Sequence, residues 1–153
     1  QAGFARCRRL SAPAGDKIEY RLGPTLMLFA LLFFLIAAHA LMDYSLQNDS
    51  MAVCKCPKST SPLAASVPWY YWLAAHAVLH GAAVGAIFRW MNFDWNVVAA
   101  LATAETVLHW FTDYGKCSKW YSMHADQAIH ITCKIAWWVL VAAEVVKPLG
   151  ASQ

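Results

Sequence analysis

Four long apolar stretches, separated by short polar connections, make up most of the chain after its first 23 residues. They run from about 24 to 44, 68 to 90, 94 to 114 and 122 to 147. A helix needs about 20 mostly apolar residues to cross the hydrocarbon core of a bilayer. The pattern therefore predicts an all-α fold, a polytopic membrane protein whose residues 24–147 form a bundle of four transmembrane helices.

Residues at the ends of these stretches are typical of helix ends. Pro24 suits the first turn of a helix, because proline lacks the N–H that would have no partner there. Ser122 and either Asn92 or Asp94 can cap the starts of later helices with their side-chain oxygens. The pair Lys147 and Pro148 is expected to end the last helix.

Each apolar stretch also carries acidic or imidazole side chains spaced four residues apart. These are His39 and Asp43; His76 and His80; Glu105, His109 and Asp113; and Asp126 and His130. A spacing of four puts two side chains on one helix face, one turn apart. Ionisable groups are costly inside a bilayer and usually face the bundle interior. Because consecutive spans alternate in direction, all these side chains are expected to meet in the outer half of the bundle.

Composition and charge agree with a membrane protein. Of the 153 residues, 59% are hydrophobic and 14% are charged. Basic residues accumulate on the cytoplasmic side of membrane proteins, and five lie in the tail 1–23. We therefore predict that this basic tail and the short C-terminal tail, 148–153, are both cytoplasmic. This bias explains the net charge of +3 without nucleic acid as a partner.

Imidazole and carboxylate side chains are ligands for zinc, and alternatively for manganese or iron. The predicted divalent-metal ligands are His39, His76, His80, His109, Asp113, Asp126 and His130, with Glu105 or Asp43 as general base. Gln47, Lys116, Gln127 and Lys134 are expected to contact the ligands or a substrate. So many donors exceed the needs of one metal, so either two metals share the site or some donors orient the others. The alternative is a polar core that has no metal.

Three further features leave alternatives open. Lys134 lies one turn after His130, and it could pair with Glu105, which would remove Glu105 from the site. The small residues at 77, 81 and 85 permit close helix packing within the bundle, or between two copies in a homodimer. Either Cys54 or Cys56 could form a disulfide with Cys117, and free thiols are the other alternative.

The polar side chains form four motifs: HxxxDxxxQ from His39, HxxxH from His76, ExxxHxxxDxxK from Glu105 and DQxxH from Asp126. Together these motifs resemble those of a family of small bacterial and phage membrane proteins of unknown function. The similarity extends over residues 31–141. The resemblance implies a bacterial or phage origin but no reaction. We expect the protein to be located in the bacterial inner membrane. The chain is also loosely similar to membrane-bound metal-dependent hydrolases.

Three functions compete at this point. The first is a metal-dependent hydrolase that acts on a lipid or a lipid-linked substrate at the outer interface of the membrane. The second is a non-catalytic subunit of a larger membrane or phage assembly, in which the polar core is structural. The third is a transporter of divalent cations or protons, because His-x-x-x-Asp pairs resemble the transport site of zinc exporters.

Overall fold

The computed structural model describes residues 23–150, and these residues form an all-α fold without strands. The predicted basic tail lies outside the described residues, apart from Gly23. The long helices are α1 (Pro24–Ala40), α3 (Trp69–Trp90), α4 (Trp95–Cys117) and α5 (Met123–Ala142). The short elements are the π-helical turn η1 (Leu41–Ser45), α2 (Asp49–Cys54) and the 3-10 turn η2 (Pro62–Ala65).

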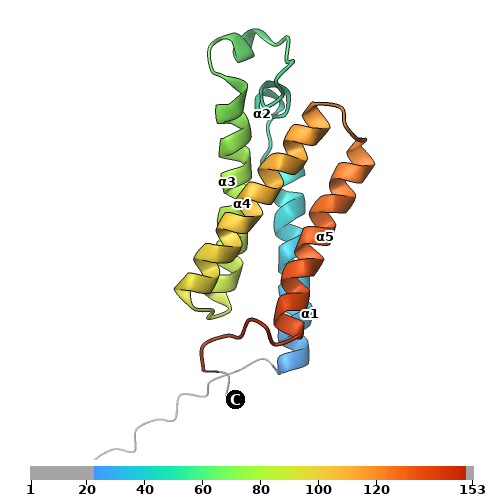
Figure 1. Ribbon diagram of the computed structural model, residues 1–153. Coiled ribbons are helices and arrows are strands. Elements are labelled where there is room, and N and C mark those ends of the chain that lie inside the picture. Colours follow the sequence, from blue (N-terminus) through green and yellow to red (C-terminus); the bar gives the residue numbers. More distant parts are fainter. Residues whose placement is uncertain (1–22, 151–153) are drawn as a thin grey trace, which may run out of the picture.

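The four long helices lie roughly along one direction and alternate in sense (Figure 1). The hairpin of α3 and α4 stands beside the pair formed by α1 and α5. The connection that contains α2 and the loop between α4 and α5 are at one end of the molecule. The turn between α3 and α4, the start of α1 and the end of α5 are at the other. Side chains one or two turns from the α2 end of different helices can therefore meet.

The helix starts follow the predicted capping. The side chain of Asp94 accepts a hydrogen bond from the backbone N–H of Asn96, and that of Ser122 accepts one from Ala125. The end of α5 differs from the prediction, because the helix stops at Ala142 instead of near residue 147. Glu144 has a φ of 55°, in the left-handed region, and this turns the chain away from the helix axis.

The C-terminal end of α1 widens into η1, where the backbone N–H of Leu46 donates to the carbonyl of Leu41 at 2.9 Å. This bond spans five residues instead of four, which defines a π-helical turn. Asp43 lies in the middle of this turn, and its side chain is buried.

The close approach of α3 and α4 depends on two glycines of the predicted small-residue stripe. A Cβ on Gly81 would lie 1.9 Å from Thr106 Oγ1 and 2.5 Å from the carbonyl oxygen of Ala102. A Cβ on Gly85 would lie 3.3 Å from the Ala102 side chain, which is tight but not impossible. The stripe therefore serves packing within the bundle.

The interior has an apolar half and a polar half. The apolar core is near the turn between α3 and α4 and contains Leu31, Leu35, Val84, Phe88, Phe93, Val98, Leu101, Trp137 and Val141. The polar half, toward α2, contains the side chains predicted from the four-residue spacing. Buried polar groups are stable only when they find partners, so this half needs an explanation of its own.

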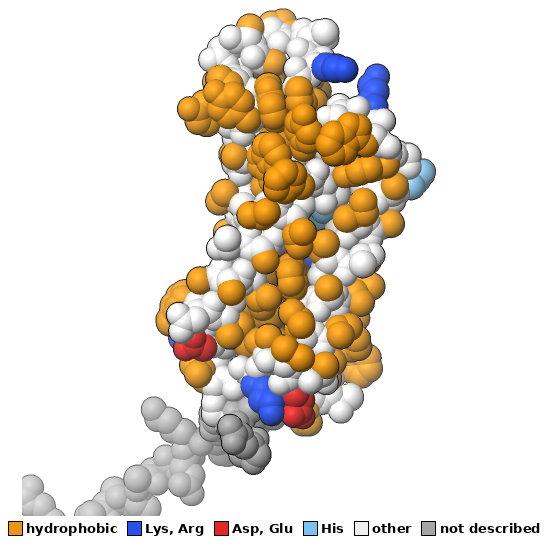
Figure 2. All heavy atoms as spheres, viewed as in Figure 1, with side chains coloured by type: hydrophobic (Ala, Val, Ile, Leu, Met, Phe, Trp, Pro, Cys, Tyr) orange, Lys and Arg blue, Asp and Glu red, His pale blue; other side chains and the backbone are white. Residues whose placement is uncertain are grey.

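The outer surface of the long helices is largely apolar. Phe33 and Phe111 are more than 60% exposed, while Glu105, Asp113 and Lys134 are at most 1% exposed. One face of the molecule shows hydrophobic side chains over its middle and charged side chains near its ends (Figure 2). Two helices, Pro24–Ser45 and Trp69–Trp90, are long and apolar enough to cross a membrane.

Candidate metal centre

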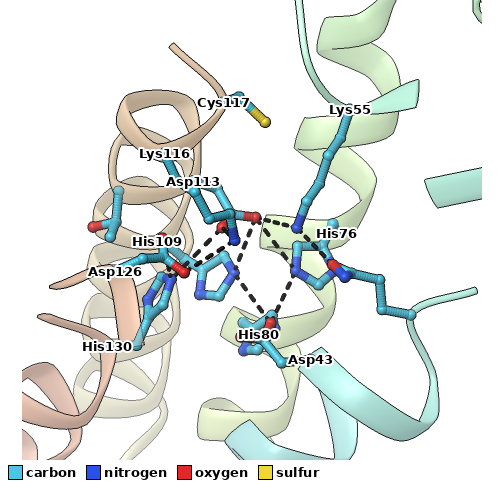
Figure 3. Close-up of polar contacts among 12 residues, drawn as sticks. Asp43, Lys55, His76, His80, His109, Asp113, Lys116, Cys117, Asp126 and His130 are labelled. Carbon is cyan, nitrogen blue, oxygen red and sulfur yellow. Dashed lines mark hydrogen bonds and ion pairs between the residues drawn. The ribbon is translucent and has the colours of Figure 1, made fainter. Parts of the chain in front are cut away.

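Side chains from η1 and from three of the long helices converge in the polar half (Figure 3). Asp43 comes from η1, His76 and His80 from α3, His109 and Asp113 from α4, and Asp126 and His130 from α5. All seven are buried. Spacing by one helical turn puts successive members of each helix on its inner face, and packing of the helices joins the faces into one cluster.

Asp43 is at the centre of a first group of donors. Its Oδ1 lies 3.2 Å from His76 Nε2, 3.1 Å from His80 Nε2 and 4.0 Å from His109 Nε2. The ligand atoms of these four residues all lie within 4.8 Å of one another. Three imidazole nitrogens and one carboxylate oxygen form a donor set that suits tetrahedral zinc.

A second group shares His109 with the first and contains Asp113 and His130. Asp113 Oδ2 lies 3.7 Å from His109 Nε2, and Asp113 Oδ1 lies 3.7 Å from His130 Nε2. The same Oδ2 is 3.5 Å from His76 Nε2. The two oxygens of Asp113 thus face opposite sides of the cluster, and Oδ2 faces the first group.

Several donor atoms of the cluster have no hydrogen-bond partner among the described residues. They include both ring nitrogens of His109, Nε2 of His130 and Oδ1 of Asp126. His80 Nε2 lies 3.1 Å from Asp43 Oδ1, but the angle does not suit a hydrogen bond. Buried polar atoms are nearly always paired in native proteins, with protein groups, water or an ion. A shared bound cation would satisfy several of these atoms together.

Two lysines hold the carboxylates at the α2 end of the cluster. Lys55 Nζ donates to Asp113 Oδ2 at 2.5 Å, and Lys116 Nζ donates to Asp113 Oδ1 at 2.7 Å and to Asp126 at 3.0 Å. Lys116 was predicted near the site, but Lys55 was missed because it comes from a connection and follows no helical spacing. Burial lowers the pKa of Lys55, and the Asp113 carboxylate opposes this shift.

Gln127 links three side chains of the cluster. Its amide nitrogen donates to Asp43 Oδ2 at 2.9 Å and to Asp126 at 3.2 Å, while its Oε1 faces His39 Nε2 at 3.1 Å. His39, a predicted ligand, therefore lies beside the cluster and outside both donor groups. Gln47 accepts a hydrogen bond from Lys55 at 2.6 Å, so it is linked to Asp113 through that lysine.

Glu105 belongs to neither donor group, although its Oε1 lies 3.9 Å from His109 Nδ1. Lys134 Nζ and Trp137 Nε1 both donate to its carboxylate, the latter at 2.7 Å. Of the two alternatives for Glu105, the structure therefore favours the ion pair with Lys134. Trp137 had no role in the sequence prediction, because a tryptophan in an apolar stretch gives no sign of its hydrogen-bond partner.

A disulfide joins Cys56 to Cys117, with 4.9 Å between their Cα atoms. This decides between the two predicted partners of Cys117, and Cys54 is a buried free thiol. The bond connects the end of α2 to the end of α4. Lys55 and Lys116 immediately precede the two bonded cysteines, so this pattern in the sequence could have pointed to Lys55.

A family model described as a protein of unknown function, DUF3307, matches residues 31–148. This range contains every residue of the cluster. Neither the curated proteins nor the solved structures include a match to the chain.

Proposed function

The chain belongs to this family of unknown function, and we propose that it is an integral membrane protein with a bundle of four membrane-spanning helices. The buried cluster inside the bundle would bind one divalent metal ion, and zinc is the metal that we expect. The observation that carries the proposal is the convergence of Asp43, His76, His80 and His109 within 4.8 Å, together with unpaired ring nitrogens. Manganese or iron would suit the same donors.

The distribution of charge supports four spans. In α4 and α5, Glu105, Asp113, Asp126 and Lys134 are at most 1% exposed, while residues such as Phe111 on the outward faces are apolar. A water-soluble bundle shows the reverse pattern. The polar stripe makes α4 and α5 less apolar than α1 and α3, but it does so with side chains that would not touch lipid.

A charge count supports one metal instead of two. With neutral imidazoles, the cluster has a net charge of −1. Three negative charges come from the carboxylates of Asp43, Asp113 and Asp126, and two positive charges come from the ammonium groups of Lys55 and Lys116. One dication brings this to +1, and a second would bring it to +3. Uncompensated charge is strongly disfavoured in a buried site, so the cluster suits one metal.

The disulfide supports the predicted orientation. Disulfides persist in oxidising compartments, which include the bacterial periplasm. We therefore assign the α2 end to the outer side of a bacterial inner membrane. The start of α1 and the end of α5 lie at the opposite end of the molecule (Figure 1), and we propose that this end faces the cytoplasm.

Hydrolysis of a lipid or lipid-linked ester is the reaction that we propose for this centre. A bound metal would supply a water of lowered pKa and stabilise charge on the attacked group. Among the candidate bases, Asp43 faces the histidines, whereas Glu105 is occupied by Lys134 and Trp137. With Asp43 as the base, His76, His80 and His109 would hold the metal and leave its fourth position for the water. Lys116, whose side chain is 20% exposed, would be the cation that contacts an anionic substrate.

The test of the proposal is metal content. The protein, purified in mild detergent, is measured by elemental mass spectrometry as wild type and as His109→Ala and Asp113→Ala variants. We expect about one metal per chain in the wild type and none in His109→Ala. Asp113→Ala should hold less metal than the wild type, because Asp113 belongs to the second donor group and its Oδ2 faces the first. His124→Ala is the matched control, because His124 is an exposed residue of the same bundle. A metal-free wild type would contradict the proposal.

The other predicted functions have less support. A transport path would need polar groups through the apolar half of the bundle, where Leu35, Val84 and Phe88 are instead closely packed. Assembly with a membrane partner or as a homodimer stays a prediction. Mass measurement of the complex in mild detergent tests it, and a monomer that purifies alone would contradict it.

A further inference from the structure

Residues 47–56, which we term the lid, cover the polar cluster at the α2 end. The lid begins at Gln47, contains α2 and ends at Cys56. Its one basic side chain, Lys55, extends from above into the cluster and reaches Asp113 (Figure 3). Lys55 is 2% exposed although it belongs to a connection between helices. The lid thus inserts a charged group into the candidate metal centre.

The lid is held to α4 at two adjacent positions. Lys55 binds Asp113 by an ion pair, and Cys56, the next residue, binds Cys117 covalently. Lys116, which precedes Cys117, binds the same Asp113 from the other side. The disulfide therefore joins the two places in the chain from which lysines converge on one carboxylate. The position of the disulfide above the cluster does not depend on which side chains bind the metal.

The lid also makes noncovalent contacts, including the buried side chain of Cys54, but we expect these to hold it less firmly than the disulfide does. α2 has six residues, and helices this short are marginal by themselves. Taking Lys55 out of water costs free energy that its pairing with Asp113 only partly offsets. The covalent bond keeps Lys55 beside Asp113 at a high effective concentration. Its loss would favour return of the ammonium group to water.

We propose that the lid is a thiol-sensitive gate on the metal centre, closed when Cys56 and Cys117 are joined and open when they are reduced. A dithiol supplies two electrons and two protons, becomes a disulfide itself and leaves two protein thiols. Lys55 then leaves Asp113 Oδ2, the oxygen that faces His76 and His109 at 3.5 and 3.7 Å. This proposal of regulation rests on the proposed metal-binding function.

The first experiment follows the lid without any metal. Metal-stripped full-length protein is treated with an amine-reactive ester before and after reduction, and labelled peptides are quantified by mass spectrometry. We expect labelling of Lys55 to rise at least tenfold on reduction. Lys58, an exposed lysine three residues away, is the internal control and should not change. A Cys56→Ser/Cys117→Ser variant should be labelled at Lys55 without reductant.

The second experiment follows the metal. Zinc-loaded protein is mixed with a chromophoric chelator, and the rate of zinc release is compared before and after reduction with a phosphine, since a dithiol would itself bind zinc. We expect release at least ten times faster from the reduced protein. Far-UV circular dichroism in both states checks that the long helices are retained.

The two experiments separate the gate from the metal site. Absence of zinc in the oxidised protein would refute the proposed function, while the labelling of Lys55 would still test the lid. Equal labelling of Lys55 in both redox states, or zinc release that reduction leaves unchanged, would overturn the gate alone.

Discussion

Gly81→Ala is expected to separate α3 from α4 and to weaken the metal centre. The added methyl group would lie 2.5 Å from the carbonyl oxygen of Ala102, a backbone atom that cannot move away alone. It would also meet Thr106 Oγ1, which donates to that same carbonyl at 2.9 Å. The two backbones would have to separate by roughly 1 Å to restore ordinary contact.

The magnitude follows from three contributions. Overpacking costs about 1 to 3 kcal/mol, and here a backbone contact favours the upper end. Displacing the Thr106 hydroxyl costs about 1 kcal/mol for its hydrogen bond. Replacing a helical glycine by alanine returns about 1 kcal/mol of helix propensity. We therefore expect Gly81→Ala to lower the free energy of unfolding by about 2 to 3 kcal/mol.

Gly85→Ala is the matched control on the same helix face. Its methyl group would lie 3.3 Å from the Ala102 side chain, so a shift of a few tenths of an ångström suffices. We expect its unfolding free energy to stay within about 1 kcal/mol of wild type, because the gain in helix propensity offsets the tighter contact.

The assay is unfolding by sodium dodecyl sulfate in mixed micelles, followed by circular dichroism, with zinc affinity measured in parallel. His80 precedes Gly81, and its ring stacks on that of His109 at 3.6 Å between centroids. A wider interface should therefore also weaken zinc binding. This account of the helix contact would be refuted if Gly81→Ala had the same unfolding free energy as the wild type, or if it lowered that free energy less than Gly85→Ala does.

Other substitutions test single contacts of the buried network. Lys134→Met leaves the Glu105 carboxylate without its cation and should destabilise the protein by about 3 to 5 kcal/mol, whereas the double variant with Glu105→Gln should recover most of this loss. Trp137→Phe removes a hydrogen bond to the same carboxylate and should cost about 1.5 to 3 kcal/mol in the same unfolding assay. His39→Ala should keep the metal with affinity lowered about 10- to 100-fold in a chelator competition, because His39 lies outside both donor groups, whereas His109→Ala should abolish binding.

The four-residue spacing was enough to predict which side chains share an interior. His76 and His80, or His109 and Asp113, lie on one face of any regular helix, and a polar face within an apolar helix must turn inward. The helix starts at Asp94 and Ser122 could likewise be predicted, because side-chain capping is a local interaction. These parts of the fold depend on residues close together in the chain.

Contacts across the bundle could not be predicted in this way. Lys55 reaches Asp113 through a connection whose path depends on the disulfide, and no periodicity specifies that path. Whether Glu105 faces the histidines or Lys134 depends on the rotation of α4 against α5. The end of α5 was predicted too late, because the left-handed backbone of Glu144 leaves no mark in the apolar pattern.

The π-helical turn η1 determines which way Asp43 points. A π-helical turn holds one residue more than the equivalent α-helical turn, so it is equivalent to a one-residue insertion near the end of α1. If the same residues were wound as a regular α-helix, without the extra residue in this turn, the residues beyond it would be rotated by about 100° relative to α1. Asp43 would then leave the histidines of α3, and the lid would begin from a different side of the bundle. The register of one turn thus couples the carboxylate of the proposed metal centre to the path of the segment that covers it.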